Sequence, residues 1–562
     1  MTTRLIGFIL CWALAVSLAG AAPVSYAVEE TKLGPWSADP LGLTVSDDGC
    51  RVAYITKHGN RQVAVVDGVA HAPFDAIEEG TLTFSPNGKH VAYAARQGRD
   101  TCIVEDGIAG PRYKRALRVV FSPDGERMAY LARKGPEVRR GGTWHVVVDG
   151  TPGSAYENVV SHTLTFSPDS KHFAYVARSD GNPVVVVDGT VGPAHKPTVS
   201  RLVVSGPIFS QRGGHFAYTV GDRERQYVVV DGVKHTEHRA LPDTLASGQE
   251  RIAYAAADDR GQFVVVDGVK GSSYDKVAPC PPVFSPDGER IVYAAQRGDS
   301  FVAVADGVEG PECRGILATS LSFSPDSKRV AYLASTLDAP TQMCVVVDGA
   351  AGQQFQLVSS ASLKFSPDSK HVAYMARKGN GYLTVLDDAV VKPHFGVDDE
   401  SLTFSPDSKR LAYAAVFGDA WHVVADGTAG EYYGGVRSIL FSPDSKRLVY
   451  AASVKECDDP ERLDDIDDDL EDIDDTWFVV ADGVEGDGYE DVRSVVFSPD
   501  SQSLAYVASQ GDEVFVVLDG KEGPRYSMVF DKGPRFDENG TLTYTAVRDM
   551  KLFRVKHVRV TP

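Results

Sequence analysis

The chain has 562 residues, of which 43% are hydrophobic and 24% are charged, and its formal net charge at pH 7 is −20. This composition is ordinary for a folded soluble protein. The strongly negative charge makes nucleic acid a poor candidate partner, because a phosphate backbone attracts basic surfaces.

Residues 1–27 predict a secretory signal peptide. Arg4 precedes an uncharged apolar run over 5–18 and small residues follow it, so cleavage is expected after Ala21 or Ala27. The run is shorter than the ~20 residues of a spanning helix, which favours a signal peptide over an uncleaved membrane anchor. No later segment is long and apolar enough to cross a membrane. The mature protein is therefore expected to be periplasmic or secreted, without an integral membrane segment.

One motif repeats through the rest of the chain. FSPDGERMAYLA at 121–132 returns as FSPDSKRLAYAA at 404–415, and a tyrosine marks the centre of each of thirteen units. Successive tyrosines are 36 to 45 residues apart, except for one spacing of 56 between Tyr450 and Tyr506. A period near 40 residues is typical of a four-stranded propeller blade. The thirteen are Tyr54, Tyr93, Tyr130, Tyr175, Tyr218, Tyr254, Tyr293, Tyr332, Tyr374, Tyr413, Tyr450, Tyr506 and Tyr544.

Four strands can be placed within a unit such as residues 392–427. Residues 401–405, 410–415 and 421–425 predict the first three strands. The Ser-Pro-Asp-Ser sequence between the first two predicts a turn, because proline presets φ while serine and aspartate bond nearby amides. An Asp-Gly pair then begins the turn toward the fourth strand, because glycine accepts a positive φ.

Many predicted strands are apolar on both faces, as in the four valines at 184–187. A half-exposed strand would alternate apolar and polar residues instead. No pattern of an amphipathic helix stands between the strands, so the sheets must cover one another. A small residue before most of the tyrosines fits such packing. Blades stacked around an axis satisfy this requirement.

The ends of the chain predict how the blades close into rings. Residues 34–36 resemble the start of a fourth strand, and the chain ends at 552–560 with a third strand. An early strand could thus complete a ring and remove an exposed edge. Thirteen blades exceed the usual four to eight. We therefore expect an all-β fold of two propellers with six and seven blades, at residues 28–270 and 271–562. Seven plus six, divided near residue 308, is the alternative.

The motif Phe-Ser-Pro-Asp-Gly/Ser-Lys-Arg-x-Ala-Tyr resembles the Pro-Asp variant of the WD-repeat family, as in TolB-like periplasmic β-propellers. The resemblance covers about residues 30–562 and implies a propeller fold. The family includes protein-binding scaffolds, and related propellers carry enzymes, so the resemblance leaves the function open. The chain differs from TolB in having thirteen repeats and no recognisable α/β domain before them.

The sequence predicts no catalytic or metal-binding residues and no cofactor. It contains neither a GxSxG nucleophile elbow nor a GxxxxGK[ST] phosphate loop, and its cysteines form no CxxC pair. His90, His172 and His371 occupy the place of an arginine in the repeat, so we interpret them as structural. The aspartates of Ser-Pro-Asp and Asp-Gly are explained by turns. His235 and His238 lack the HExxH spacing, and Cys102 and Cys344 are expected as buried thiols.

An acidic insertion at 456–475 breaks the repeat between the second and third strands of one blade. It holds 13 acidic residues against one arginine. It is either a solvated loop, a calcium site, or a docking segment for a basic partner. A calcium site of the EF-hand type is disfavoured because the glycine that such a loop needs is absent. The candidate partner-binding residues here are Asp467, Asp468, Asp469 and Asp472.

The two halves of the repeat region differ in charge. Residues 28–270 have a net charge of −1 and residues 271–562 of −20. The loops between second and third strands in the first half are often basic, which makes Arg96, Arg99, Arg139 and Arg140 further candidates for partner binding. We expect these loops to emerge on one face of a propeller.

The sequence favours an exported, non-catalytic scaffold that binds proteins or envelope polymers through its loop faces. The alternative is a propeller enzyme, a hydrolase or lyase, with a site in a central funnel. A purely structural component is a third hypothesis.

Overall fold

The computed structural model describes residues 25–37, 40–135, 142–192, 203–221, 226–339, 341–454, 476–530 and 532–560. These residues form eleven antiparallel β-sheets and two short 3₁₀ helices, η1 (Ser161–Thr163) and η2 (Ala318–Ser320). The nine-stranded and the ten-stranded sheet each contain two repeat units, so the described chain comprises thirteen blades. In this part of the chain, no helix has the length and apolar character needed to cross a membrane.

Each blade has four strand positions, as predicted. In the tenth blade the order is β44 (Gly396–Val397) and β45 (Thr403–Phe404), then β46 (Leu411–Phe417), β47 (Ala420–Ala425) and β48 (Thr428–Tyr433). The first position is split because only its two ends pair with β46. The predicted strands agree with β45, β46 and β47 to within about two residues.

The remaining strands fall into the same four positions. The second position, which carries the repeat tyrosine, is occupied by β3 (Val52–His58), β8 (Val91–Gln97), β12 (Met128–Lys134), β17 (Phe173–Ser179), β22 (Phe216–Gly221), β26 (Ile252–Asp258), β31 (Ile291–Arg297), β36 (Val330–Thr336), β41 (Val372–Lys378), β50 (Leu448–Ser453), β54 (Leu504–Gln510) and β59 (Leu542–Arg548). The third position is occupied by β4 (Arg61–Val66), β9 (Asp100–Glu105), β13 (Thr143–Val148), β18 (Asn182–Val187), β23 (Gln226–Val230), β27 (Gly261–Val266), β32 (Ser300–Ala305), β37 (Cys344–Val347), β42 (Gly381–Leu386), β51 (Trp477–Ala481), β55 (Glu513–Leu518) and β60 (Lys551–Val560).

First and fourth strands are shorter in most blades. The first position holds β2 (Gly42–Val45), β6 (Ala76–Ile77), β7 (Thr83–Phe84), β11 (Arg115–Phe121), β15 (Asn158–Val159), β16 (Thr165–Phe166), β20 (Val203–Val204), β21 (Ile208–Phe209), β25 (Ala246–Ser247), β29 (Lys276–Val277), β30 (Val283–Phe284), β34 (Cys313–Ile316), β35 (Ser322–Phe323), β39 (Leu357–Val358), β40 (Lys364–Phe365), β49 (Gly435–Phe441), β53 (Asp491–Phe497), β57 (Met528–Val529) and β58 (Arg535–Phe536). The fourth holds β5 (Val69–Ala70), β10 (Ile108–Ala109), β14 (Thr151–Pro152), β19 (Thr190–Val191), β24 (Val233–Ala240), β28 (Val269–Lys270), β33 (Val308–Glu309), β38 (Ala350–Ala351), β43 (Ala389–His394), β52 (Val484–Glu485), β56 (Lys521–Glu522) and, in the last blade, β1 (Ser25–Pro35).

The two ends of the described chain meet and close the ring. β1 pairs antiparallel with β60 from Ser25 opposite Val560 to Pro35 opposite Lys551. The last blade therefore takes its fourth strand from the start of the chain, which confirms the predicted closure by an early strand. Residues 1–24 of the predicted signal peptide lie outside the described residues.

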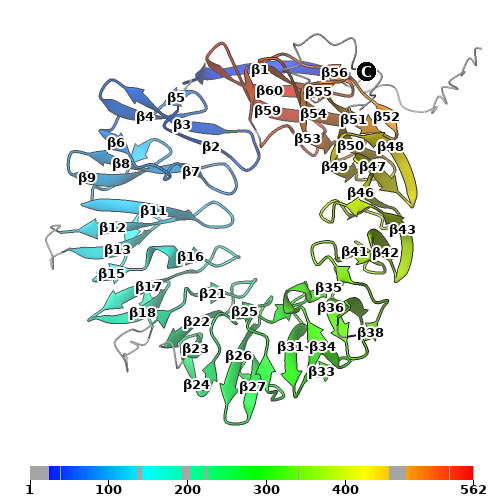
Figure 1. Ribbon diagram of the computed structural model, residues 1–562. Helices are drawn as coiled ribbons and strands as arrows, with labels where there is room; N and C mark the ends of the chain where they lie inside the picture. The colour runs from blue at the N-terminus through cyan, green and yellow to red at the C-terminus, as the bar shows by residue number, and fades with distance from the viewer. Residues whose placement is uncertain are drawn as a thin grey trace, which may run out of the picture.

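The blades form one ring, not two (Figure 1). First strands lie nearer the middle of this ring and fourth strands nearer its outside. The predicted division near residue 270 is wrong, because Val264 of the sixth blade and Tyr293 of the seventh blade share one buried core. The alternative near residue 308 is wrong for the same reason, since Val292 packs in one core with Tyr332.

The chain forms one ring because it has one strand that can close a ring from a distant part of the sequence. A division would expose two apolar sheet faces, and each new ring would need its own strand from elsewhere in the chain. Among the described strands, β28 and β33 next to the two predicted boundaries pair with the preceding strand of their own blade. Only β1 comes from the far end of the sequence, so it closes a single ring.

Both faces of each sheet are buried, as the sequence predicts. In the tenth blade Tyr413 is 1% exposed and fills one face, while Ala412 is fully buried on the other. Tyr413 lies with Ala373 in the core between the ninth and tenth blades, and Ala412 lies in the core between the tenth and eleventh blades. Cys102 and Cys344 are buried and unpaired, which confirms the prediction of buried thiols.

The Asp-Gly turns adopt the geometry of tight hairpins. Asp67 has a φ of 49° and Gly68 a φ of 78°, so both central residues are left-handed, as a type I′ turn requires. The Asp67 carboxylate accepts hydrogen bonds from the amide of Val52 at 3.0 Å and from the Arg51 guanidinium at 2.8 Å. These turn aspartates therefore serve the structural role that the sequence predicts.

Neighbouring blades are also tied together through their Ser-Pro-Asp turns. Arg51 donates a second bond to the carbonyl oxygen of Gly88 in the next blade at 2.9 Å. Ser170 adopts a left-handed φ of 64°, and its hydroxyl accepts a bond at 3.0 Å from the amide of Asp124 in the preceding blade. Glycine, which adopts a positive φ without strain, occupies the same position in other blades, for example Gly88 and Gly125. At Ser170 the cost of the left-handed backbone is offset by the hydrogen bond that its hydroxyl makes between blades.

The alanine before the tyrosine gives a direct test of the stacking. We expect Ala412→Leu to lower the free energy of unfolding by about 1–3 kcal/mol, because the added carbons overpack the space between two sheets. Ala412→Val should be milder, since Val292 and Val449 occupy the equivalent position. Urea unfolding of the three proteins measures the difference. Equal stability of Ala412→Leu and wild type would contradict face-to-face packing.

The Ser-Pro-Asp turns predict a loss of stability in acid. A hydroxyl bond from Ser324 lowers the pKa of Asp326 to about 2, and Ser442 does the same for Asp444. Because the folded pKa lies below the unfolded value of 3.8, this stabilisation is complete above about pH 4 and disappears as the pH falls through about 2.

The urea midpoint should accordingly fall steeply over this range of pH. Double substitution of Asp326 and Asp444 by asparagine should make the fall less steep. A wild-type midpoint that is the same at about pH 2 as at about pH 6 would refute this role of the turns.

Candidate functional site

The antiparallel strands give the ring two different faces. Ser-Pro-Asp turns and Asp-Gly turns lie at the same ends of the strands, on what we name the turn face. The loops between second and third strands emerge at the opposite ends, together with the connections from one blade to the next. We name this second side the loop face.

Three exposed aromatic side chains gather on the loop face of the tenth blade. Phe395 is 64% exposed, Phe417 56% and Tyr432 50%. The ring centroids of Phe395 and Phe417 are 5.2 Å apart in a T-shaped contact, and those of Phe417 and Tyr432 are 5.9 Å apart. These three residues form what we name the aromatic patch.

Regular strand pairing positions each member of the patch. Phe417 is the last residue of β46, where its partner Ala420 begins β47. Phe395 follows β43, and its amide donates to the carbonyl of Val416 at 3.2 Å. Tyr432 lies in β48, directly before Tyr433, which is the last residue of that strand. Three backbone segments that are held by sheet hydrogen bonds thus present the three rings.

The patch replaces polar residues of the repeat. Glutamine or lysine stands at the position equivalent to Phe417 in Gln97, Lys378 and Gln510. The position of Phe395 holds Asp75, Glu157 and Gln356 in other blades, and that of Tyr432 holds Arg112, Gln354 and Arg525. The repeat motif by itself does not reveal the patch. Aligning the units position by position would reveal each substitution, although not that the three rings meet.

Two buried histidines form the layer under the patch. His394 is 8% and His422 3% exposed, and their ring centroids lie 5.7 Å apart. The Nε2 atom of His394 shares a hydrogen bond of 3.0 Å with the Tyr413 hydroxyl. His422 contacts the ring of Tyr432 at a centroid distance of 5.1 Å. The exposed rings are therefore supported from below by the core of the blade.

A cleft of about 510 Å³ adjoins the patch where the ninth blade meets the tenth. Phe395 lines it together with Tyr382, Arg377 and Asp399. The Arg377 guanidinium lies 5.8 Å from the centroid of the Tyr382 ring, and Asp399 accepts a short hydrogen bond from the Ser359 hydroxyl. The surface thus combines apolar rings with a few charged groups, a combination typical of binding sites.

The residues that flank the acidic insertion lie close to the patch. These residues, Val454 and Thr476, are joined by a hydrogen bond of 2.9 Å from the Val454 amide. Gly434, two residues after Tyr432, approaches Val454 so closely that an added Cβ would lie 2.4 Å from its carbonyl oxygen. The candidate residues Asp467, Asp468, Asp469 and Asp472 lie outside the described residues.

The basic candidates are separated from the patch. Arg96 and Arg99 are exposed at the loop between β8 and β9, on the loop face of the second blade. Arg139 and Arg140 lie outside the described residues. A role of these arginines in partner binding remains a prediction.

The histidines of the repeat occupy the positions expected of them. His90, His172 and His371 each bond the aspartate of their Asp-Gly or Asp-Asp turn, at 2.6–2.7 Å. His235 and His238 both lie in β24 and pack against aromatic rings, with the His238 ring 4.7 Å from that of Phe263.

Comparison with known proteins identifies no family. No family model matches the sequence, and no curated protein matches it. Among solved structures, the β-propeller domain of the trilobed protease from Pyrococcus furiosus aligns at 15% identity over 59% of this chain and 98% of that chain, with a TM-score of 0.21. TolB from Acinetobacter baumannii aligns at 16% identity over 47% of this chain and 63% of that chain, with a TM-score of 0.19.

A puromycin hydrolase aligns at 13% identity over 56% of this chain and 61% of that chain, with a TM-score of 0.24. Similarities at this level carry no argument about function. The propeller-like arrangement of blades follows from the sheets of this chain itself.

We expect the aromatic patch to be dispensable for folding. Glutamine occurs at all three equivalent positions elsewhere, so substituting Phe395, Phe417 and Tyr432 by glutamine should change the free energy of unfolding by less than about 0.5 kcal/mol each. Binding of a fluorescent apolar dye should fall in the triple variant, because an exposed apolar surface is lost. Replacement of the exposed Val269 and Val308 by glutamine is the matched control. A large loss of stability would instead assign the patch to the core.

Proposed function

We propose that this protein is an exported, non-catalytic scaffold that binds a partner protein through the loop face of its ring. The observation that carries the proposal is the aromatic patch. Its three rings are at least half exposed, lie together, and replace residues that are polar in other blades. Exposed apolar patches mark interaction sites, and aromatic residues are enriched at protein interfaces.

The charges around the patch favour a basic partner. Asp399 and Arg377 both line the adjoining cleft and offset each other in charge, while Asp419, two residues after Phe417, and Glu431, directly before Tyr432, are acidic. The insertion that starts after Val454 adds 13 acidic residues against one arginine. Such a surface attracts a basic polypeptide and speeds its association, while the rings receive its apolar side chains.

The use of the repeat carboxylates supports a non-catalytic role. The aspartates of the Asp-Gly turns bind backbone amides and arginine or histidine side chains, as Asp67 does. Those of the Ser-Pro-Asp turns accept bonds from serine hydroxyls and amides, as Asp326 does. These groups are engaged in holding the blades together, which is the role that a scaffold needs.

Export rests on the N-terminal sequence. Of the two predicted cleavage positions, we favour the one after Ala21. It leaves β1 complete, whereas cleavage after Ala27 would remove the pairs that Ser25, Tyr26 and Ala27 make with β60.

Site-specific photo-crosslinking in the producing cells tests the proposal. A benzophenone amino acid at position 417 should form an adduct with a basic protein, and the same amino acid at the equivalent position 97 should not. The adduct should weaken at about 0.5 M salt, where the Debye length falls to a few ångströms. It should disappear when Phe395 and Tyr432 are replaced by glutamine.

Equal adducts at both positions would overturn the assignment of the patch. An adduct that contains polysaccharide instead of protein would identify an envelope polymer as the ligand and would refute a basic protein partner.

A further inference from the structure

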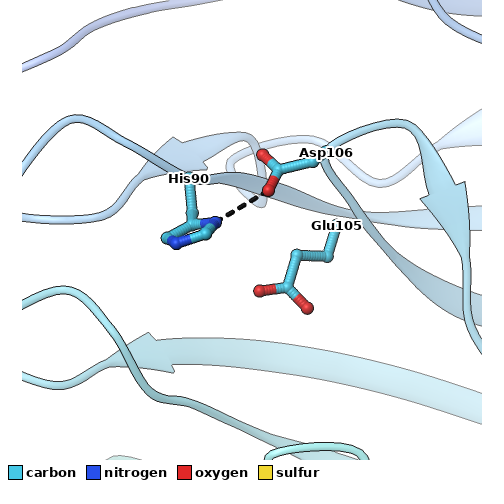
Figure 2. A group of neighbouring side chains, drawn as sticks. All are labelled: His90, Glu105 and Asp106. Carbon is cyan, nitrogen blue, oxygen red and sulfur yellow. Dashed lines mark hydrogen bonds and ion pairs between the residues drawn. The ribbon is translucent and has the colours of Figure 1, made fainter.

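His90, Glu105 and Asp106 come together on the turn face of the second blade (Figure 2). One ligand atom from each lies within 4.8 Å of those of the other two. His90 directly precedes β8, Glu105 ends β9, and Asp106 begins the turn that follows. The Nδ1 atom of His90 and Oδ2 of Asp106 are 2.7 Å apart. We name this group the second-blade triad.

Glu105 distinguishes this blade from the others that have a histidine here. The same His–Asp pair recurs in His172–Asp188, His215–Asp231 and His371–Asp387, at 2.6–2.7 Å. The residue before the aspartate is Val187, Val230 or Leu386 in those blades. Three blades therefore have two of the donor groups, and only the second blade adds a further carboxylate.

The Glu105 carboxylate is half-buried and lies beside the carboxylate of Asp106. Within the described ranges, no hydrogen bond or ion pair reaches the Glu105 side chain. A half-buried glutamate next to a second carboxylate, at a position that is aliphatic in the other blades with a histidine, is favoured by a cation that compensates for its charge.

We propose that the second-blade triad binds a divalent transition metal ion, with zinc as the metal that fits its donors best. Zinc accepts both imidazole nitrogen and carboxylate oxygen as ligands, and the second-blade triad offers one of the first and two of the second. Calcium prefers six to eight oxygen ligands, so an imidazole argues against it. Three protein ligands leave a fourth tetrahedral position for water or a ligand from outside.

Binding requires only local movement. Zinc bonds of about 2.0–2.2 Å would draw the donor atoms closer together than they lie now. Glu105 can approach by side-chain rotation, and the metal would take the place of the proton that His90 and Asp106 share. The ion would then link the start of β8 to the end of β9. Arg51 makes the corresponding link in the first blade by bonding Asp67.

Zinc titration of the tag-free, EDTA-treated full chain tests the proposal. Calorimetry should detect one zinc ion bound per chain, and calcium should not compete for it. Glu105→Val, which introduces the residue of other blades, and Glu105→Gln, which keeps the shape, should each weaken binding at least tenfold. His172→Arg is the matched control, because it removes an equivalent His–Asp pair without a neighbouring glutamate, and it should leave zinc binding unchanged.

A rise of the melting temperature on adding zinc, present in wild type and absent in Glu105→Val, is the second expected result. The melting transitions show that wild type and Glu105→Val are both folded, and the rise in wild type shows that zinc binds the folded state. The proposal is overturned if wild type binds no zinc, if Glu105→Val binds it as tightly as wild type, or if His172→Arg weakens it equally. These outcomes are independent of the aromatic patch.

Discussion

Burial of both faces of every sheet is the constraint on which this structure depends. A blade with Tyr413 on one face and Ala412 on the other is stable only between two neighbours. A row of such blades has an uncovered face at each end, and bending the row into a ring removes both. The pairing of β1 with β60 stabilises the closed ring, because it joins the two ends of the described chain in one sheet. The number of blades then follows from the number of repeats, not from the preferred size of a propeller.

The turns explain why the repeat is so strictly maintained. Its aspartates hold the hairpins, and its arginines and serines reach the next blade, as Arg51 reaches Gly88 and Ser170 receives Asp124. Each residue of the motif therefore takes part in contacts within a blade or between blades. Departures from the repeat therefore indicate where another requirement acts.

Two departures carry the functional proposals. At Phe395, Phe417 and Tyr432, polar residues of the loop face become a cluster of exposed rings, close to the residue Val454 that precedes the acidic insertion in sequence. At Glu105, an aliphatic residue becomes a carboxylate that shares its surroundings with His90 and Asp106. The first surface suits a basic polypeptide and the second a metal ion. They lie on opposite faces of the ring, so one protein could hold both ligands at once.

The sequence alone determined the blade. Periodicity, the Ser-Pro-Asp and Asp-Gly turns, and strands apolar on both sides predicted four strands, face-to-face stacking and closure by an early strand, because these depend on local conformation and on burial. Only the tertiary structure decided that thirteen blades make one ring. The blades on both sides of residue 270 pack in the same way as the others, and the sequence of a single unit does not specify how many blades close a ring. It also decided which residues meet. Phe395 and Tyr432 are separated from Phe417 in the sequence, and the pairing of their strands brings the three rings together. Glu105 lies close to His90 because β8 and β9 are antiparallel neighbours.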